Sequence, residues 1–135
     1  MKTLNIEAKT DNLISVLEFI DEELDRAGCD LKAKLQIDIA AEELFVNVSN
    51  YSYHPYTGDV SISIRIVGDP ARAEITFIDS GMPYNPLERK DPDVGLSAEE
   101  RQIGGLGVFM VKKSMDSMTY EYKDGCNIVT IMKYI

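Results

Sequence analysis

The chain has 135 residues, 44% of them hydrophobic, so a single domain can bury a substantial apolar core. The formal net charge of -9 argues against a nucleic-acid partner or an anionic membrane surface, because negative charges repel each other at long range. A small phosphate ligand that carries its own Mg²⁺ is compatible with this charge. The sequence contains no stretch of about 20 apolar residues and no signal-type segment, so we expect a cytoplasmic protein without a membrane partner.

Two helices are expected after a short first strand. Residues 4–6 alternate between apolar and polar side chains, as in a half-buried strand. Apolar residues recur at helical spacing over residues 13–24, until Gly28 stops the pattern. A second, longer helix is expected from about Asp30 toward Asn50. The apolar positions of this second helix are Leu31, Leu35, Ile39 and Leu44.

The middle of the chain predicts two adjacent strands and a long loop. Residues 60–66, VSISIRI, and residues 73–79, AEITFID, alternate almost perfectly and are joined by a turn at residues 68–70. Residues 82–103 contain several prolines and charges with little periodicity, which is long for a loop in so small a domain. Loops of this length are usually functional, so this segment is a candidate part of a site.

A third helix is expected after Gly107 through about Asp116. The chain closes with two strands, residues 118–123 and 127–135, around an Asp-Gly hairpin turn at residues 124–125. The order is therefore strand, helix, helix, strand, strand, long loop, helix, strand, strand. Strands in such antiparallel hairpins leave the helices one face of the sheet on which to stack, which predicts an α/β fold.

Three glycines, Gly104, Gly105 and Gly107, stand at the start of the third helix. A helix start has unpaired backbone N–H groups and a partial positive charge, and glycines there let an anion approach the backbone. The glycines could therefore wrap a phosphate, or they could form a flexible hinge. A Walker loop is excluded because no Gly-Lys-Ser/Thr tripeptide occurs, and a dinucleotide fingerprint lacks its third small residue and its preceding strand.

A carboxylate follows the strand at residues 73–79, in the stretch DSGMPYNP. Asp79 emerges at the carboxyl end of this strand, and Gly81 permits a sharp turn or the close approach of a ligand. The carboxylate could accept a hydrogen bond from an exocyclic amino group such as that of adenine. Alternatively, Asp79 caps an Asx-turn in which Gly81 is the turn residue.

The second helix carries two polar residues in an otherwise apolar region. Glu43 and Asn47 are four residues apart and project from the same helix face, with Asn50 about one turn further on. An amide oxygen of Asn47 is a hard ligand suited to Mg²⁺, and Glu43 could take a proton from a hydroxyl nucleophile. The alternative is that these residues form a solvated helix face.

The order of these three motifs resembles that of a known family. Glu43 to Asn47 on a helix, Asp79 to Pro83 after a strand, and Gly104-Gly105-Leu106-Gly107 at a helix start are similar to the ATP-binding domain of DNA gyrase, heat-shock chaperones, mismatch-repair ATPases and sensor histidine kinases. Within this GHKL superfamily the chain most resembles the small anti-sigma-factor serine kinases of bacteria. Their motifs read ExxxN, DxGxPFxP and GGLGxFL, and the resemblance covers nearly the whole chain.

The resemblance implies one domain over residues 1–135 with the Bergerat fold, a two-layer α/β sandwich in which a mixed sheet is packed on one face by three helices. It implies that Glu43 is the general base, that Asn47 coordinates Mg²⁺, and that Asp79 binds the adenine amino group of ATP. Residues 85–103 would form the ATP lid. The remaining nucleotide contacts implied by the resemblance are Asn50, Gly81, Pro83, Arg101, Gly104, Gly105, Leu106, Gly107 and Val108.

Within this set the resemblance implies different roles. Gly81 would line the base pocket, the glycines at the helix start would approach the phosphates, and Val108 would supply N–H donors. Arg101 would contact the γ-phosphate. Relatives often carry a basic residue at the place of Asn50, so phosphate affinity or transfer is expected to be weaker in this chain.

The resemblance implies a protein-serine/threonine kinase that uses Mg-ATP to phosphorylate a small anti-anti-sigma-type, STAS-like partner. It also implies that a sigma factor is sequestered, and it suggests a homodimer. The alternative is a non-catalytic switch, in which ATP orders the lid and thereby changes a protein-binding surface. Asn50 favours the switch, whereas Glu43 at the position of the base favours catalysis.

Overall fold

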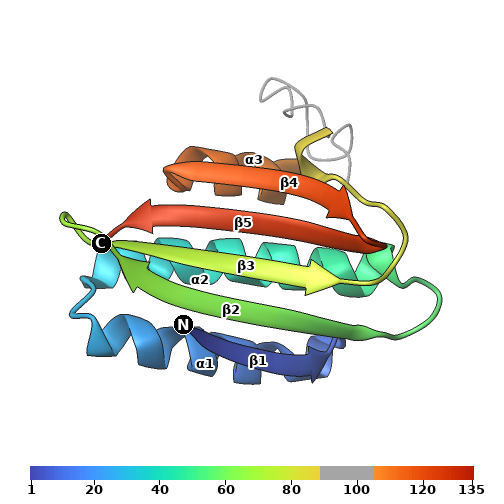
Figure 1. The fold of residues 1–135 in the computed structure, drawn as a ribbon, viewed down its shortest axis with the longest axis horizontal. Helices are drawn as coiled ribbons and strands as arrows, with labels where there is room; N and C mark the ends of the chain where they lie inside the picture. The colour runs from blue at the N-terminus through green and yellow to red at the C-terminus, as the bar shows by residue number, and fades with distance from the viewer. Residues whose placement is uncertain (89–104) are drawn as a thin grey trace.

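The structure is a computed structural model that describes residues 1–88 and 105–135, with only the backbone of residues 105–106. A five-stranded sheet lies against three helices, which all cover the same face (Figure 1). The strands are β1 (Lys2–Glu7), β2 (Asp59–Val67), β3 (Arg72–Asp79), β4 (Ser117–Lys123) and β5 (Cys126–Tyr134). The helices are α1 (Leu13–Arg26), α2 (Leu31–Asn47) and α3 (Gly105–Ser114). None of the helices in the described ranges is long and apolar enough to cross a membrane.

The strand order is β1-β2-β3-β5-β4, and all four neighbouring pairs are antiparallel. The expected α/β sandwich with three helices on one face is confirmed, but the expectation of a mixed sheet is wrong for these five strands. β3 and β4 do run in the same direction, because both pair antiparallel with β5. They are not neighbours, since β5 returns through a tight hairpin and lies between them.

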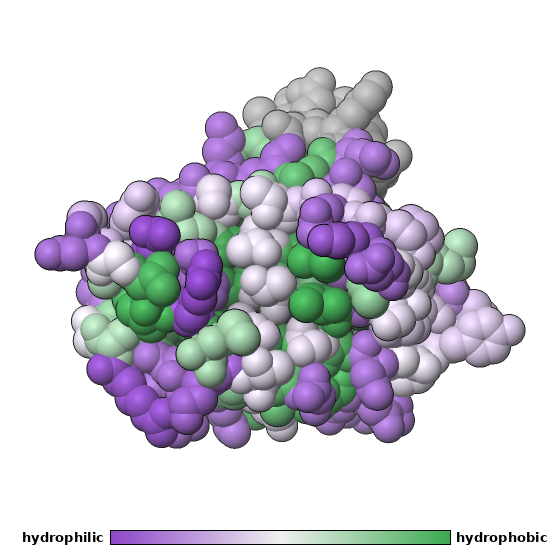
Figure 2. All heavy atoms as spheres, viewed as in Figure 1, coloured by the Kyte–Doolittle hydropathy of each residue, from purple (hydrophilic) through white to green (hydrophobic). Residues whose placement is uncertain are grey.

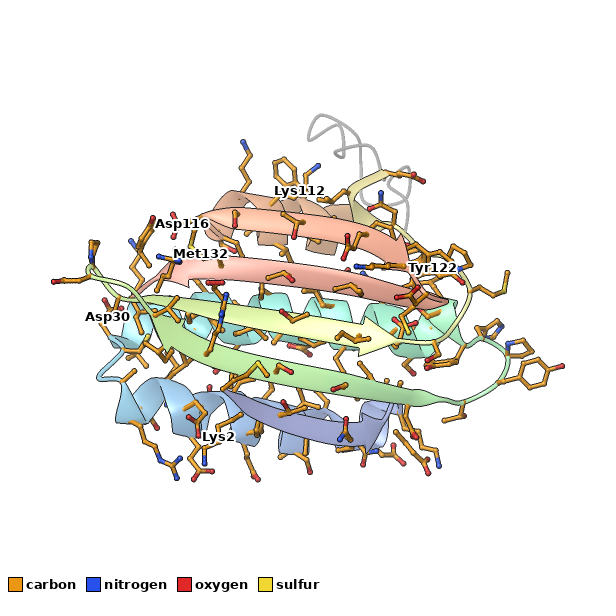
Figure 3. All side chains as sticks on the ribbon, viewed as in Figure 1. Lys2, Asp30, Lys112, Asp116, Tyr122 and Met132 are labelled. Carbon is orange, nitrogen blue, oxygen red and sulfur yellow. The ribbon has the colours of Figure 1, made fainter. Side chains whose placement is uncertain are left out.

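The hairpin of β4 and β5 is fixed at both ends. Its turn is Asp124-Gly125, with φ of 53° and 77°, and two consecutive positive φ angles are what a type I′ turn requires. At the other end, the backbone N–H of Asp116 donates to the carbonyl oxygen of Met132 at 2.9 Å, and these residues lie side by side in Figure 3. The Asp116 carboxylate accepts from the backbone N–H of Tyr134 at 2.8 Å. The register of β5 is therefore fixed at both ends of the hairpin.

The helix α2 is the middle helix of the layer and contacts both α1 and α3. It begins as expected, because the Asp30 side chain caps it by accepting from the backbone N–H of Ala33 at 2.8 Å (Figure 3 labels Asp30). Its buried face differs from the expected apolar positions. Leu31, Leu35 and Ile39 are 69%, 52% and 58% exposed. The buried positions are Ala33, Ile37, Ala40, Ala41, Leu44, Phe45 and Asn47.

The third helix begins at Gly105, three residues before the expected start at Val108. The glycines at residues 105 and 107 thus form its first turn and do not merely precede it. Val108 and Val111 are buried against the rest of the protein, and this packing holds the helix despite the low helix propensity of glycine. The first four backbone N–H groups of α3, from Gly105 to Val108, have no intrahelical acceptor.

The second face of the sheet carries no helix, and it faces the viewer in Figure 2. A row of hydroxyl side chains crosses it in register, one from each strand: Thr3, Ser63, Thr76, Thr130 and Thr119. Two pairs in this row are within hydrogen-bonding distance at 3.1 Å, Thr3 with Ser63 and Thr76 with Thr130. The apolar residues of β2, β3 and β5 alternate to the opposite face, where they form the core under the helices.

Candidate functional site

Asp79 ends β3 and points into a small cavity between the sheet and α2. The cavity has a volume of about 20 Å³, which is room for about one water molecule. Its lining residues are Leu44, Asn47, Val48, Ser52, Phe77, Asp79, Tyr84, Pro86, Asn127 and Val129. Asp79 and Asn47, two residues singled out from the sequence, therefore come together across 32 residues of chain. Asp79 is 4% exposed and Asn47 is 5% exposed.

The carboxylate of Asp79 is held by three donors. Its Oδ1 accepts from the backbone N–H of Gly81 at 3.0 Å and from Nδ2 of Asn127 at 2.9 Å. Its Oδ2 accepts only a long hydrogen bond, 3.4 Å, from the hydroxyl of Ser52. Burial raises the pKa of Asp79 above its ordinary value, and these hydrogen bonds oppose that increase. One lone pair of Oδ2 is left to accept a donor from a ligand.

The Asx-turn alternative and the ligand alternative for Asp79 are compatible. The Gly81 N–H bond to Asp79 is the Asx-turn. It occupies Oδ1 only, so Oδ2 remains available at the cavity wall.

The segment after β3 is tied to the end of α2. The helix α2 continues as a π-helix, Val48–Ser52, and the backbone carbonyl of Ser52 accepts from the N–H of Met82 at 2.8 Å. A Cβ at position 81 would overlap the backbone of Ser52, so only glycine permits this close approach. π-helical turns are frequent at functional sites. This turn brings Ser52 to Asp79 and sets the position of Asn47 relative to the strand end.

The amide nitrogen of Asn47 is buried and has no hydrogen-bond partner among the described residues. A buried donor without a partner costs free energy, which a ligand in the cavity would offset. Glu43 lies one turn earlier on the same face of α2 and is half-buried. The solvated-face alternative therefore fails for Asn47, which faces the cavity.

A second hollow, of about 380 Å³, lies between α2 and α3. Its lining residues are Ile39, Glu42, Glu43, Val46, Gly107 and Met110. The carboxylate of Glu43 lies directly against Gly107, because a Cβ at that position would overlap it. Asn47 lines the small cavity and Glu43 lines the larger hollow. Because these residues are one turn apart, the cavity and the hollow lie next to each other along one face of α2.

The remaining residues expected at the site fall into three groups. Arg101, Gly104 and residues 89–103 of the expected lid lie outside the described residues, and only the backbones of Gly105 and Leu106 are described. Val108 is in the first turn of α3, with its side chain 1% exposed. Asn50 and Pro83 are exposed and do not line the small cavity.

Two residues of the site were not identified from the sequence. Asn127 lies near the start of β5 and is 1% exposed, and Ser52 is 3% exposed. The pairing of β3 with β5 places Asn127 directly opposite Asp79. The sequence does indicate Asn127, because this polar residue occupies a position of an alternating strand where an inward-facing apolar residue is expected.

The segment that follows Gly81 forms part of the cavity wall. Tyr84 and Pro86 form part of its lining, and the ring of Tyr84 stacks on that of Tyr51 with centroids 4.9 Å apart. The backbone N–H of Tyr84 donates to Oδ1 of Asn127 at 2.9 Å. A purine is much larger than a water molecule, so Tyr84 and Pro86 must move before a base can enter.

An antiparallel sheet under three helices, with a buried strand-end aspartate facing a buried helical asparagine, defines a class of ATPase domain. The chain belongs to the histidine kinase-like ATPase domain family, whose model matches residues 6–133. It is 30% identical over 115 residues to the serine-protein kinase RsbW of Listeria monocytogenes, covering 82% of this chain and 71% of the relative. It is 20% identical over 135 residues to the serine/threonine-protein kinase BtrW of Bordetella bronchiseptica, covering 98% and 92% of the two chains.

Solved structures share the fold. The RsbU and RsbW domains of Rv1364c from Mycobacterium tuberculosis match with a TM-score of 0.65 at 17% identity. That match covers 98% of this chain and 32% of the other, so the chain spans about a third of that structure. The histidine kinase AdeS of Acinetobacter baumannii matches with a TM-score of 0.56 at 15% identity. The family model and the 30% identical relative confirm the resemblance to anti-sigma-factor kinases of the GHKL superfamily, and the solved structures show the shared fold.

The residues present fit a Mg-nucleotide. Within the described ranges, no group of three or more His, Cys, Asp or Glu side chains is placed to hold a metal ion. Mg²⁺ is commonly bound by one or two protein oxygens together with substrate phosphates and water. A single amide oxygen from Asn47 is sufficient for that mode, and Nδ2 of the same amide has no hydrogen-bond partner among the described residues.

Proposed function

We propose that residues 1–135 act as one Mg-ATP-binding protein-serine/threonine kinase domain of the anti-sigma-factor type. The observation that carries this proposal is the buried pair of Asp79 and Asn47, which line one cavity. Oδ2 of Asp79 accepts one long hydrogen bond, and Nδ2 of Asn47 has no hydrogen-bond partner among the described residues. The relationship to serine-protein kinases supports the same reaction class.

In this proposal the base of the nucleotide occupies the Asp79 cavity after Tyr84 and Pro86 move aside. Oδ2 of Asp79 accepts the adenine amino group, a charge-assisted hydrogen bond worth about 1.5–3 kcal/mol. Asn47 would hold the metal, and the triphosphate would extend along α2 toward the hollow at Glu43 and Gly107. The N–H groups of the first turn of α3, which have no acceptor within the helix, donate to phosphate oxygens there.

Bound Mg²⁺ supplies positive charge that stabilises the developing charge on the transferred phosphoryl group. Glu43 acts as the general base. It accepts the proton of the attacking serine or threonine hydroxyl while the hydroxyl oxygen bonds to the γ-phosphorus and the bond to ADP breaks. Gly107 permits this geometry because any side chain there would displace the carboxylate.

The partner we propose is a small anti-anti-sigma-type, STAS-like protein that carries the acceptor hydroxyl, together with a sigma factor that the domain sequesters. The relatives named as serine-protein kinases support a protein substrate. The net charge of -9 argues against nucleic acid as the partner.

A second candidate function is an ATP-dependent binding switch without phosphoryl transfer. It is favoured by the small volume of the cavity, because nucleotide binding must move the segment at Tyr84 and Pro86 and thereby change a protein surface. The exposed Asn50, at the place where relatives often carry a basic residue, also favours it.

Replacement of Glu43 by alanine separates the two functions. With an anti-anti-sigma-type protein from the same organism and radiolabelled Mg-ATP, a kinase retains nucleotide binding and loses phosphoryl transfer by at least about a hundredfold. Glu18→Ala is the control, because it removes an exposed carboxylate of α1 that does not line the hollow. Undiminished transfer in Glu43→Ala contradicts the assigned base, and partner binding that responds to ATP without any transfer in the wild type supports the switch.

A further inference from the structure

Every hydrogen-bonding position of the Asn127 side-chain amide is used by a contact within the protein. Its Nδ2 donates to Oδ1 of Asp79 at 2.9 Å and to the carbonyl oxygen of Met82 at 2.8 Å. Its Oδ1 accepts from the backbone N–H of Tyr84 at 2.9 Å and from the hydroxyl of Tyr120 at 2.6 Å. An asparagine amide has two donor hydrogens and two acceptor lone pairs, so all four are used. The side chain is therefore fixed in one orientation by β4, by β3 and by the segment that follows β3.

This arrangement decides how many acceptor sites Asp79 presents. A carboxylate has about four lone-pair sites, two on each oxygen. Asn127 and the backbone N–H of Gly81 fill both sites of Oδ1, and the Ser52 hydroxyl takes one site of Oδ2 at 3.4 Å. Counted over the contacts of residues 1–88 and 105–135, a single site remains, on Oδ2. Asp79 therefore presents one free acceptor oxygen to the cavity. A carboxylate without these hydrogen bonds would present both of its oxygens.

We propose that Asn127 is a specificity-determining residue, which makes the pocket select adenine over guanine by withholding Oδ1 of Asp79. The proposal rests on the proposed function, in that the base of a nucleotide enters this cavity. Adenine presents one donor group, its 6-amino group, beside a ring-nitrogen acceptor. Guanine presents two adjacent donors, N1–H and the 2-amino group, which pair with the two oxygens of a free carboxylate.

With Oδ1 occupied, one of the two guanine donors has no acceptor on Asp79. Leu44, Phe77 and Val129 make much of the cavity wall apolar, and the Ser52 hydroxyl in that wall already donates to Oδ2 of Asp79. A buried donor left without an acceptor lowers affinity by about 5- to 150-fold. A site that pairs with one donor therefore binds guanine, which presents two adjacent donors, more weakly than adenine. Asn127 acts through Asp79, so it is a positioning residue for base recognition.

A purely structural role for Asn127 predicts a different result. If it only holds the segment from Met82 to Tyr84 in place, its loss weakens ATP and GTP to the same extent. The ratio of the two affinities is therefore the quantity that distinguishes base selection from general support of the fold.

The test on the unaltered protein compares Mg-ATP, Mg-GTP and Mg-ITP by calorimetry. Inosine lacks the 2-amino group and so presents one donor where guanine presents two. With one acceptor site on Asp79, the wild type binds ATP at least about tenfold more tightly than GTP, and ITP at least about fivefold more tightly than GTP. Tighter binding of GTP than of ITP overturns the proposal. Failure of all three nucleotides to bind overturns the proposed function instead.

The test by substitution uses Asn127→Ala and the smaller change Asn127→Ser. Both free a site on Oδ1, so the ratio of GTP to ATP dissociation constants falls by at least about fivefold in whichever variants fold. Tyr120→Phe is the matched control, because it removes the hydroxyl at Asn127 Oδ1 and leaves the bond from Nδ2 to Asp79. An unchanged ratio in a folded Asn127 variant contradicts the proposal, as does an equal fall in Tyr120→Phe. If neither Asn127 variant folds, the relative affinities of the wild type for GTP and ITP test the proposal on their own.

Discussion

The carboxylate of Glu43 lies against the backbone of Gly107, and these residues come from the two helices that enclose the larger hollow. The contact joins the residue that we propose as the base to the helix turn that we propose as the phosphate site. The absence of a side chain at position 107 is therefore a requirement for the position of Glu43.

Replacing Gly107 by alanine is expected to push the Glu43 side chain away from α3. Alanine favours a helix over glycine by about 1 kcal/mol, so the fold is retained, while Mg-ATP affinity and any phosphoryl transfer fall. A double-mutant cycle with Glu43→Ala isolates the contact, because the new methyl group has nothing to displace once Glu43 is shortened. Chemical denaturation of the four proteins should give a coupling free energy of about 0.5 kcal/mol or more, and additive effects contradict the contact.

Gly81→Ala is expected to destabilise the protein more than an ordinary loop substitution. The new methyl group would overlap the backbone of Ser52, and the backbone cannot give way without loss of the bond from Met82 N–H to Ser52. We expect a loss of about 1–3 kcal/mol in the free energy of unfolding. Ser80→Ala, next to it and exposed, is the control and should change stability by less than about 0.5 kcal/mol. If Gly81→Ala and Ser80→Ala changed the free energy of unfolding equally, the backbone at Gly81 would not be in close contact with that of Ser52.

Asp38 makes the stability of the helix layer depend on pH. Its Oδ1 and that of Asp21 on α1 are buried without hydrogen-bond partners among the described residues. Burial and Asp21 raise the pKa of Asp38 from 3.8 to about 7, Asp25 adds to this, and Lys34 opposes it. The native state thus holds a proton that the unfolded chain loses, so the free energy of unfolding falls as the pH rises from 3.8 to about 7.

The substitution Asp38→Asn removes this titration. Relative to the wild type, the variant should gain stability at pH about 8 and gain much less near pH 4, measured by denaturation across that range. Glu18→Gln, which removes one exposed carboxylate from α1, is the control for the change in net charge. An equal gain in stability of Asp38→Asn at pH about 8 and near pH 4 would contradict a raised pKa of Asp38 in the native state.

The strands and helices of the fold could largely be predicted from periodicity, because β2, β3 and β5 alternate and one of their faces is buried. The buried face of α2 could not. Leu31, Leu35 and Ile39 have the spacing of core residues but are exposed, while Ala33, Ala40 and Ala41 are buried. The small alanines let the middle helix lie close to its neighbours, and the packing partners that decide this are distant in the sequence.

Of the candidate site, Asp79 and Asn47 were predicted because each has a recognisable local context. Asn127 was missed because its importance depends on strand register, which places it opposite Asp79 at a separation of 48 residues. Ser52 was missed because a π-helical turn is wider than an α-helical one, so residues after Asn47 do not follow the spacing assumed from the sequence.

The most direct test of the account is calorimetric titration of Mg-ATP into the folded wild type and into Asp79→Asn. The account predicts saturable binding to the wild type and at least about tenfold weaker binding to the variant, because the charged acceptor for the adenine amino group is lost. Ser80→Ala serves as the control and should bind as the wild type does. Absence of heat with the wild type, or equal affinity in Asp79→Asn, would contradict the claim that this cavity is a nucleotide site.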